Sequence, residues 1–377
     1  MHSRILAIVR KETREVLRDP IYLGLAIAVP VVVMTLLGLG FVLDVKNLPV
    51  AFYDQDRSSL SREYIYSFTN SEYFHLVGLV NDPAQLDHMI RSAEVRAVVV
   101  IPPDFSRKLS AGKPATVQIL VDGSFATRAL VVTGYVAAID AQFNAQLAAD
   151  YLARRGVVAT TLLPVSVEGR VWYNPSLETK NSIVPGLLVI NLMFYPSLLA
   201  ALVVVREKER GTIFNLYCSP VRRWEVIVGK AVPYIGVALA DYFLLFALSM
   251  VVFQVRFVGN FFVLTLAALL YICCCVGLGL VISVLCRTQV AAILITFVGL
   301  MTPSMLFSGM LTPIASMDRS AQMISRVIPA SYFMGMARGV FLKGLGFYYY
   351  IPDFLTLCAF AFVVYGIAII AFRKKVG

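Results

Sequence analysis

Charged residues are scarce in this sequence. Asp, Glu, Lys and Arg together make up 15% of the 377 residues, whereas 59% of the residues are hydrophobic. A soluble domain contains about 25% charged residues. The composition therefore excludes an ordinary soluble protein and predicts a membrane protein.

Long stretches of the chain contain no ionisable residue at all. A helix that spans a bilayer needs about 20 mostly apolar residues. Five runs of that length contain no Asp, Glu, Lys, Arg or His, and a sixth contains only Asp241. We therefore predict a polytopic α-helical membrane protein with six transmembrane helices, in the runs 20–43, 181–205, 231–255, 257–286, 288–317 and 354–372. The first run is too long for the apolar region of a cleavable signal peptide, so we expect it to remain as an anchor.

The motifs of nucleotide binding and hydrolysis are also missing. The sequence has no G-x-x-x-x-G-K-[ST] loop, no H-E-x-x-H and no G-x-S-x-G. Its three histidines, His2, His75 and His88, are too scattered to form a ligand cluster. We therefore expect no enzyme activity, no metal and no cofactor bound by this chain alone.

Cysteine is absent from residues 44–180, the part of the chain that is large enough to use disulfides outside the cell. The run Cys273–Cys275 does not have the spacing of a metal site. We predict that these cysteines act as small buried apolar side chains.

The distribution of charge predicts the orientation in the membrane. Six spans place both termini on one side, and that side would hold fifteen Lys and Arg against six acidic residues. Residues 44–180 hold thirteen basic and fourteen acidic residues. Because basic residues collect on the cytoplasmic side, we expect both termini and the loop 206–230 to be cytoplasmic. The net charge of +10 then reflects topology, and no nucleic-acid partner is expected.

Residues 1–19 predict an amphipathic helix at the cytoplasmic membrane surface. Ile5, Leu6, Val9, Val16 and Leu17 recur at helical spacing, and basic residues mark the other face. Such a helix lies in the lipid headgroup layer. Contact with a cytoplasmic partner stays an open alternative. The chain ends in a basic cytoplasmic tail, 373–377.

Residues 44–180 alternate strand and helix signals, and their length suits one α/β domain, inserted outside the cytoplasm between the first two spans. The expected strands are Val50–Tyr53, His75–Val80, Val95–Ile101, Thr116–Val121 and Val165–Tyr173. The expected helices are Ser59–Phe68, Asp82–Glu94 and Ser124–Arg154. A second irregular segment, 312–352, is rich in Pro and Gly and predicts a short re-entrant or interfacial helical hairpin on the outer side.

The loop 206–230 gathers six basic and three acidic residues between two apolar runs. Arg206–Arg210 continues the second span with charges spaced for pairing along the helix. Gly211 then bends or ends that helix, Thr212–Cys218 forms a short helical segment, and Pro220 stops it. Charged caps that follow the positive-inside rule would explain the basic residues, but not the acidic ones. We favour a short rigid helix that a cytoplasmic motor can push.

Several stretches resemble one family. "REKERGT", "SPVRRWEVIVGK" and the "PY" of the next span look like the signature of ABC-2 type transporter permeases. "VRAVVVIPPDFSRKLSAGKPATVQILVDGS" followed by a long helix is similar to the extracytoplasmic domain of the bacterial inner-membrane permeases of the multidrug-efflux type. "SGMLTPIASM" and "IPASYFMGMARGVFLKG" resemble the loop before the last span of that family. The resemblance covers nearly the whole chain.

The resemblance implies a permease subunit that exports drugs or other amphipathic molecules across the bacterial inner membrane. It implies a second permease chain, identical or related, and a separate ABC ATPase subunit that binds ATP and Mg. A periplasmic adaptor protein is a further possible partner. By resemblance, Glu207, Glu209, Arg210, Gly211 and Thr212 meet the ATPase, and we add Arg206, Arg222 and Arg223 of the same loop as coupling candidates.

Asp241 is the one ionisable residue deep within a span, which makes a functional role the first hypothesis. If it lines the transport pathway, it favours cationic amphiphiles, with Asn191 and Tyr195 as further pathway candidates. The alternative is a protonated or hydrogen-bonded acid that joins two helices through Tyr242, Tyr234 or a nearby serine. Two other functions also stay open: export of a lipid-linked glycan or peptide, and a membrane receptor or scaffold that transports nothing.

Overall fold

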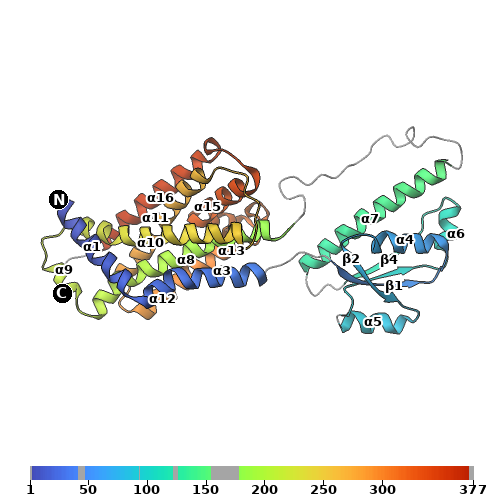
Figure 1. Cartoon of the computed structure of the whole chain (residues 1–377), viewed down its shortest axis with the longest axis horizontal. Helices are drawn as coiled ribbons and strands as arrows, with labels where there is room; N and C mark the ends of the chain where they lie inside the picture. The colour runs from blue at the N-terminus through green and yellow to red at the C-terminus, as the bar shows by residue number, and fades with distance from the viewer. Residues whose placement is uncertain (1, 41–46, 93, 122–125, 154–177, 373–377) are drawn as a thin grey trace. The chain divides into compact units, whose positions relative to one another are not determined.

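The chain folds into two compact units, which are described separately. The computed structural model describes all residues except 1, 41–46, 93, 122–125, 154–177 and 373–377. One unit combines Met1–Val42 with Val171–Gly377, and the other is Leu43–Arg170. The first unit is helical and the second contains a β-sheet (Figure 1).

The helical unit begins with α1 (His2–Arg18) and a helical stretch made of α2 (Pro20–Leu23), the π-helical η1 (Gly24–Ala28) and α3 (Val29–Gly40). After the second unit the chain continues through α8 (Lys180–Glu209), α9 (Ile213–Tyr217), α10 (Arg223–Val251) and α11 (Phe261–Leu285). It ends with α12 (Gln289–Thr296), η3 (Phe297–Met301), α13 (Thr302–Phe307), η4 (Ile314–Ser316), α14 (Arg319–Val327), α15 (Pro329–Arg338), η5 (Gly339–Lys343), η6 (Phe347–Tyr350) and α16 (Ile351–Ala371).

Within the described residues, five helices are long and apolar enough to cross a membrane. They are Lys180–Glu209, Arg223–Val251, Phe261–Leu285, Gln289–Phe307 and Phe347–Ala371. The first apolar run of the sequence forms a shorter apolar helix, Gly24–Gly40. The prediction of a largely helical, multi-pass membrane protein is thus confirmed, with five of the predicted spans present as long helices.

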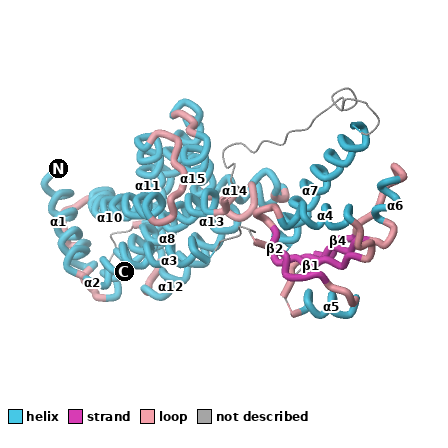
Figure 2. Tube along the Cα trace, turned by 45° about the vertical axis from the view of Figure 1, so that its right-hand side comes forward, coloured by secondary structure: helices cyan, strands magenta, loops and turns pink. Residues whose placement is uncertain are grey.

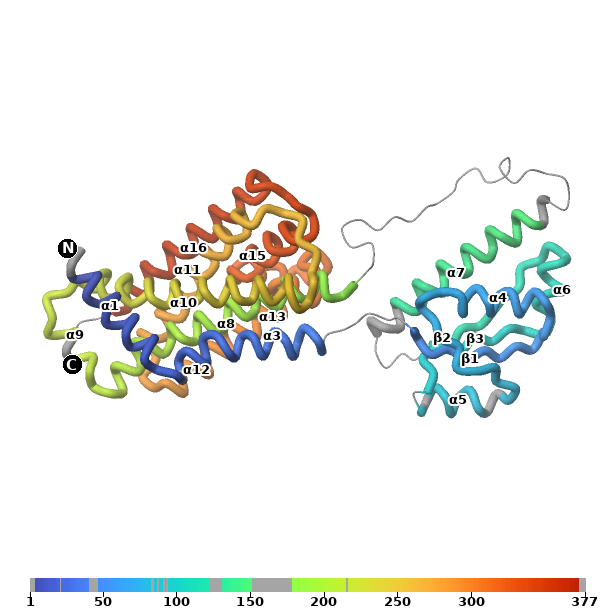
Figure 3. The backbone as a smooth tube through the Cα atoms, in the orientation of Figure 1, coloured from blue at the N-terminus to red at the C-terminus, as the bar shows by residue number. Residues whose placement is uncertain are grey.

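Helix α8 forms the centre of this unit, and α3, α10, α11, α12 and α15 all contact it (Figure 3). Its closest neighbour is α11, because small residues line the seam between the two helices. A Cβ atom added at Gly279 would lie 2.2 Å from the carbonyl oxygen of Ser197. The Ser197 hydroxyl donates a hydrogen bond of 2.9 Å to the carbonyl of Cys275. Such close backbone approach is a main source of helix association in lipid, where hydrophobic burial adds little.

The cysteine run lies on α11. Cys274 and Cys275 are fully buried, and Cys273 is half-buried. The Cys274 thiol donates to the carbonyl of Leu357 on α16, over 3.3 Å. The prediction of small buried apolar side chains is therefore confirmed for Cys274 and Cys275.

The irregular segment 312–352 contains two short helices. The residues of α14 are mostly exposed, whereas α15 is mostly buried and packs against α8, α11 and α16. Phe333, Met336 and Ala337 of α15 are completely buried. Helices thus form in this segment as the sequence predicts.

The second unit is built on a β-sheet, drawn in magenta in Figure 2. The sheet has four strands in the order β2-β1-β3-β4. Its strands are β1 (Leu48–Asp54), β2 (Phe74–Leu79), β3 (Ala97–Ile101) and β4 (Gln118–Val121). β1 runs parallel to β2 and to β3, and β4 is antiparallel to β3. The helices are α4 (Ser59–Thr69), α5 (Pro83–Arg91), α6 (Phe105–Ser110) and α7 (Ala126–Ala153).

Both faces of the sheet are covered. Val50 and Phe52 of β1 pack with residues of α4 and α7, whereas Ala51, between them, packs with α5. This alternation is the two-residue period of a strand. Four predicted strands and three predicted helices are confirmed here, and α6 was not predicted. The fifth predicted strand, Val165–Tyr173, lies outside the described residues.

Candidate functional site

One end of the helical unit gathers both ends of the chain around the loop 206–230. The guanidinium group of Arg4 on α1 donates to the carbonyl of Pro220, over 2.8 Å. The ring of Tyr217 on α9 lies 6.2 Å from the ring of Phe372, just after α16. The N-terminal helix, α9 and the end of α16 therefore share one end of the bundle, as Figure 1 shows.

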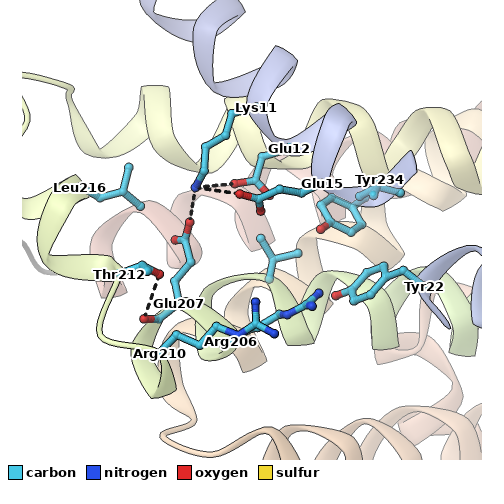
Figure 4. A pocket seen from close by; sticks show the side chains of 12 residues that line it. Lys11, Glu12, Glu15, Tyr22, Arg206, Glu207, Arg210, Thr212, Leu216 and Tyr234 are labelled. Carbon is cyan, nitrogen blue, oxygen red and sulfur yellow. Dashed lines mark hydrogen bonds and ion pairs between the residues drawn. The ribbon is translucent and has the colours of Figure 1, made fainter. Parts of the chain in front are cut away.

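A buried ionic network joins α1, α8 and α10 at this end, and Figure 4 shows the part of it made by Lys11, Glu12 and Glu207. The ammonium group of Lys230, which is completely buried, lies 2.6 Å from Oε1 of Glu12 and 2.9 Å from Oε2 of Glu207. Nζ of Lys11 lies 2.8 Å from Oε1 of Glu207. Two cations and two carboxylates from three helices therefore neutralise one another. We call these four residues the ionic junction.

Each charge of the ionic junction depends on its partners, because a buried ion without a partner is strongly unfavourable. Lys11 is half exposed and also lies 3.5 Å from Glu15. Burial by itself lowers the pKa of Lys11, but the hydrogen bond and the charge of Glu207 outweigh it, so the pKa lies above its usual value. Lys11 is therefore charged at neutral pH and holds α1 against α8.

Arg206 connects α8 to the link between α1 and α2. Its guanidinium group lies 2.8 Å from the carboxylate of Asp19 and 5.4 Å from the centre of the Tyr22 ring. The Tyr22 hydroxyl donates to the carbonyl of Leu199 on α8, over 3.2 Å. The start of the first apolar run is thereby fixed to α8 by an ion pair, a cation–π contact and a hydrogen bond.

The last turn of α8 also holds the turn between α11 and α12. The ammonium group of Lys208 donates to three carbonyl oxygens at the end of α11, those of Ser283, Val284 and Cys286. A cation at this position complements the partial negative charge of a helix C-terminus. The carboxylate of Glu209 accepts hydrogen bonds from the backbone and the side-chain amide of Gln289.

A cavity of about 330 Å³ lies between α1, α8, α9 and α10, next to the ionic junction (Figure 4). It is lined by Lys11, Glu12, Glu15, Val16, Tyr22, Val203, Arg206, Glu207, Arg210, Thr212, Leu216 and Tyr234. The rings of Tyr22 and Tyr234 are 6.3 Å apart and meet edge to face. The four helices are therefore held together by polar contacts around a hollow as well as by the apolar core that they share.

The predicted coupling candidates fall into two groups. Glu209, Arg210, Gly211, Thr212, Arg222 and Arg223 are exposed. Arg206 and Glu207 are directed inward to Asp19 and to the ionic junction. The prediction that these charges pair along the helix is wrong for Arg206 and Glu207, because Asp19 binds Arg206, and Lys11 on α1 and Lys230 on α10 bind Glu207.

Gly211 ends α8 with a φ of +72° and lets the chain turn into α9. A Cβ atom at this position would meet nothing within 4 Å, so only the left-handed backbone opposes a side chain. We expect Gly211→Ala to lower the free energy of unfolding by about 1–2 kcal/mol. Thermal melting of the purified protein measures this. Gly236→Ala, at an open position in the middle of α10, should leave the melting temperature unchanged or raise it. If the two variants had the same melting temperature, the left-handed backbone at Gly211 would not be what opposes a side chain there.

Sequence reasoning missed Glu12 and Lys230 as partners. Of the predicted apolar positions on α1, Val16 is buried, whereas Leu6 and Leu17 are 67% and 59% exposed. Glu12 is buried as well. Ile8, Glu12 and Val16 follow one another at helical spacing. An acidic residue in a buried apolar stripe signals a cationic partner, and Lys230, at the edge of an apolar run, is that partner.

The structure brings together two of the three pathway candidates. Asp241 on α10 is 1% exposed and Tyr195 on α8 is 7% exposed, and the two interact electrostatically. Asn191 is buried, and its amide donates to the carbonyl of Leu187 on the same helix.

The hydrogen-bonded alternative for Asp241 is wrong within the described residues, since neither of its carboxylate oxygens has a hydrogen-bond partner there. The Tyr242 hydroxyl lies 3.2 Å from the hydroxyl of Thr265 instead, and Tyr234 lies beside Tyr22. Asp241 therefore does not join helices through these residues.

These features define a class: a multi-pass membrane protein whose spanning helices meet a charged, partly exposed loop at one end. The sequence profile of the ABC-2 family transporter proteins matches residues 20–370. The chain belongs to this family, and it is a membrane permease of that type.

Relatives along most of the chain agree with this assignment. The chain is 30% identical to the probable multidrug ABC transporter permease YbhS of Escherichia coli (strain K12) over 342 residues, 90% of this chain and 89% of the relative. It is 30% identical to the probable multidrug ABC transporter permease YbhR of the same strain over 343 residues, 91% of each. It is 27% identical to the inner membrane transport permease YhhJ of that strain over 334 residues, 87% of this chain and 86% of the relative.

Proposed function

We propose that this chain is the transmembrane subunit of an ABC exporter in the bacterial inner membrane, driven by a separate ATPase subunit. The ionic junction is the observation that carries this proposal. It connects the exposed loop around α9 to two other helices through buried charges, so a force on the loop reaches the bundle. ATP and Mg would be bound by the ATPase subunit.

The surface around α9 has the chemistry of a docking site. Arg210, Arg222 and Arg223 are exposed there, and Phe214 of α9 is 53% exposed. The only exposed acid of the loop, Glu209, is engaged with Gln289. The loop therefore presents net positive charge around an aromatic side chain, which suits a groove with acidic edges on the ATPase.

Coupling would act through α1, α8 and α10 together. When the ATPase pushes α9, the displacement passes to α8 across the short turn at Gly211. The Glu207–Lys230 pair passes it on to α10, and Lys11 and Lys230 pass it to α1. Because unpaired buried charges are unfavourable, these three helix ends move as one body.

The membrane arrangement is part of the same proposal. Helical backbone from Pro20 to Gly40 spans 21 residues, about 30 Å of helix, which is enough for a sixth span. Six spans place both termini and the loop 206–230 in the cytoplasm and the α/β unit outside. A second permease chain completes the transporter, and a periplasmic adaptor is a possible outer partner.

Drugs or other amphipathic molecules are the substrates we propose. Two relatives are described as probable multidrug permeases, and Asp241 with Tyr195 provides an acidic and aromatic pair inside the bundle. Export of a lipid-linked glycan or peptide is the alternative. A receptor or scaffold without transport is less consistent with a chain whose relatives carry transport names along most of their length.

The test is co-purification of an ATPase with the tagged chain in mild detergent. We expect the double variant Arg210→Glu, Arg223→Glu to weaken this association about tenfold or more, because it reverses two exposed charges outside the ionic junction. Arg319→Glu, an exposed position on α14, is the matched control and should change nothing. Equal recovery of the ATPase with both variants would contradict the proposed docking surface.

A further inference from the structure

Asp241 is buried in an apolar span without any polar contact that would stabilise its charge. It is 1% exposed, and both carboxylate oxygens lack a hydrogen-bond partner among the described residues. Tyr195 is the titratable neighbour with which it interacts.

The helices packed against α10 bring no cation near Asp241. α3 and α11 contain no charged residue, and α16 contains only Asp353. The charged side chains of α1 and α8 that pair with α10 are Glu12 and Glu207, both bound to Lys230, which is eleven residues, or about 16 Å of helix, before Asp241. Lys180, at the other end of α8, pairs with Glu178. The remaining charged residues of α10 are Arg223 and Glu225, which lie still further from Asp241 than Lys230 does.

An ionised carboxylate removed from water without a hydrogen bond or a counter-ion is disfavoured by several kcal/mol. The neutral acid carries a much smaller penalty. Asp241 is therefore protonated in this conformation. In this conformation the neutral, protonated form of Asp241 is the favoured one. The ionised form would become favourable only if a positive charge were bound next to it.

We propose that Asp241 is an exchange site, which holds a proton in this conformation and gives it up when a cationic amphiphile binds beside Tyr195. This inference rests on the proposed export function and names the substrate class. In the exchange the O–H bond of the carboxylic acid breaks and the proton goes to water. The carboxylate left behind pairs with the positive charge of the substrate, and no electron is transferred.

Exchange keeps the charge of the site constant. A protonated acid is neutral, and so is a carboxylate paired with a monovalent cation. A cation can therefore enter the bundle without adding net charge to a medium that strongly opposes it. The Tyr195 ring favours the same ligand, since organic cations bind to aromatic faces.

The site lies on the same two helices that the ionic junction connects. Tyr195 is twelve residues before Glu207 on α8, and Asp241 is eleven residues after Lys230 on α10. Both distances correspond to about 16–18 Å of helix. A change in the distance or orientation between Glu207 and Lys230 would therefore also change the position of Tyr195 relative to Asp241. Substrate exchange is in this way linked to the loop around α9.

The experiment measures proton release when tetraphenylphosphonium, a cation that cannot itself titrate, binds to the purified transporter complex in weakly buffered solution. We expect close to one proton per bound cation from the unaltered protein. Triphenylphosphine oxide, a neutral molecule of related shape, should release none. Asp241→Asn should release no proton and should bind tetraphenylphosphonium at least about tenfold more weakly. Asp353→Asn, an acid at the start of α16, should behave like the unaltered protein.

Three results would overturn the exchange site: no binding of the cation to the unaltered protein, binding without proton release, or unchanged binding and release in Asp241→Asn. Folding of the variant is checked by thermal melting. Asn has nearly the shape of a neutral Asp, so its melting temperature should stay close to that of the unaltered protein. A large increase would mean that Asp241 is ionised at rest, which also overturns the proposal. If the exchange site is overturned but the ATPase still co-purifies with the chain in the same preparation, the proposed export function is retained.

Discussion

Replacing Lys230 by methionine is expected to lower the free energy of unfolding by about 3–5 kcal/mol, because it leaves the buried carboxylates of Glu12 and Glu207 without their buried cation. Lys230 lies 2.6 Å from Glu12 and 2.9 Å from Glu207, whereas Lys11, the other cation of the ionic junction, is half exposed and lies 3.8 Å from Glu12 and 2.8 Å from Glu207. Thermal or denaturant unfolding of the purified protein measures the effect. The same variant should lose coupling of ATP hydrolysis to transport, since α10 is no longer tied to α8.

Two further variants test whether the loss of stability comes from the ionic junction and not from removing a lysine as such. Lys180→Met removes an ammonium group 3.1 Å from Glu178, in a partly exposed pair, and should change stability by less than about 1 kcal/mol. Combining Lys230→Met with Glu12→Gln removes one of the stranded charges and should recover part of the lost stability. If Lys230→Met and Lys180→Met melt alike, the ionic junction does not hold the helices together.

Placing a methyl group on Gly279 is expected to force α8 and α11 apart. The new Cβ atom would lie 2.2 Å from the backbone carbonyl oxygen of Ser197, which cannot rotate away as a side chain can. Overpacking of this kind lowers stability by about 1–3 kcal/mol or more. Thermal melting and the yield of folded protein from membranes both report the loss.

Gly366 on α16 provides the matched control. A Cβ atom there would meet nothing within 4 Å, so Gly366→Ala should leave the melting temperature unchanged or raise it slightly. If Gly279→Ala and Gly366→Ala have the same melting temperature, the backbones of α8 and α11 are not as close at Gly279 as described above.

The sequence predicts most elements of this fold because apolar runs and strand alternation are local signals. The runs around 181–205 and 257–286 became α8 and α11, and the short segment after Gly211 became α9. The ends of elements were less certain: α10 begins at Arg223, well before its apolar run 231–255, because the Glu225 carboxylate accepts a hydrogen bond from the backbone of Arg222 at the start of the helix. Local signals therefore predict which elements form better than where they end.

The candidate site was predicted only in part, because its partners are distant in the sequence. The loop 206–230 could be identified from its composition, but nothing in a single sequence pairs Glu207 with Lys11 or Lys230. Glu12 was overlooked because the apolar positions of α1 alone were followed, whereas the buried side of the helix also holds this acid. Periodicity finds an amphipathic helix, whereas only packing shows which of its residues point inward.

The ionic junction also has a consequence for how the protein is made. Glu12 and Lys230 are separated by 218 positions along the chain, so the ribosome produces the acid long before the base. Until α10 has been inserted, Glu12 on the newly made N-terminal helix has no Lys230 to bind and stays at the aqueous surface. Closure of this end of the helical unit therefore waits for the helices that follow the α/β unit. A chain truncated before Lys230 would leave α1 loose, which exposes it to proteases and distinguishes unfinished molecules from completed ones.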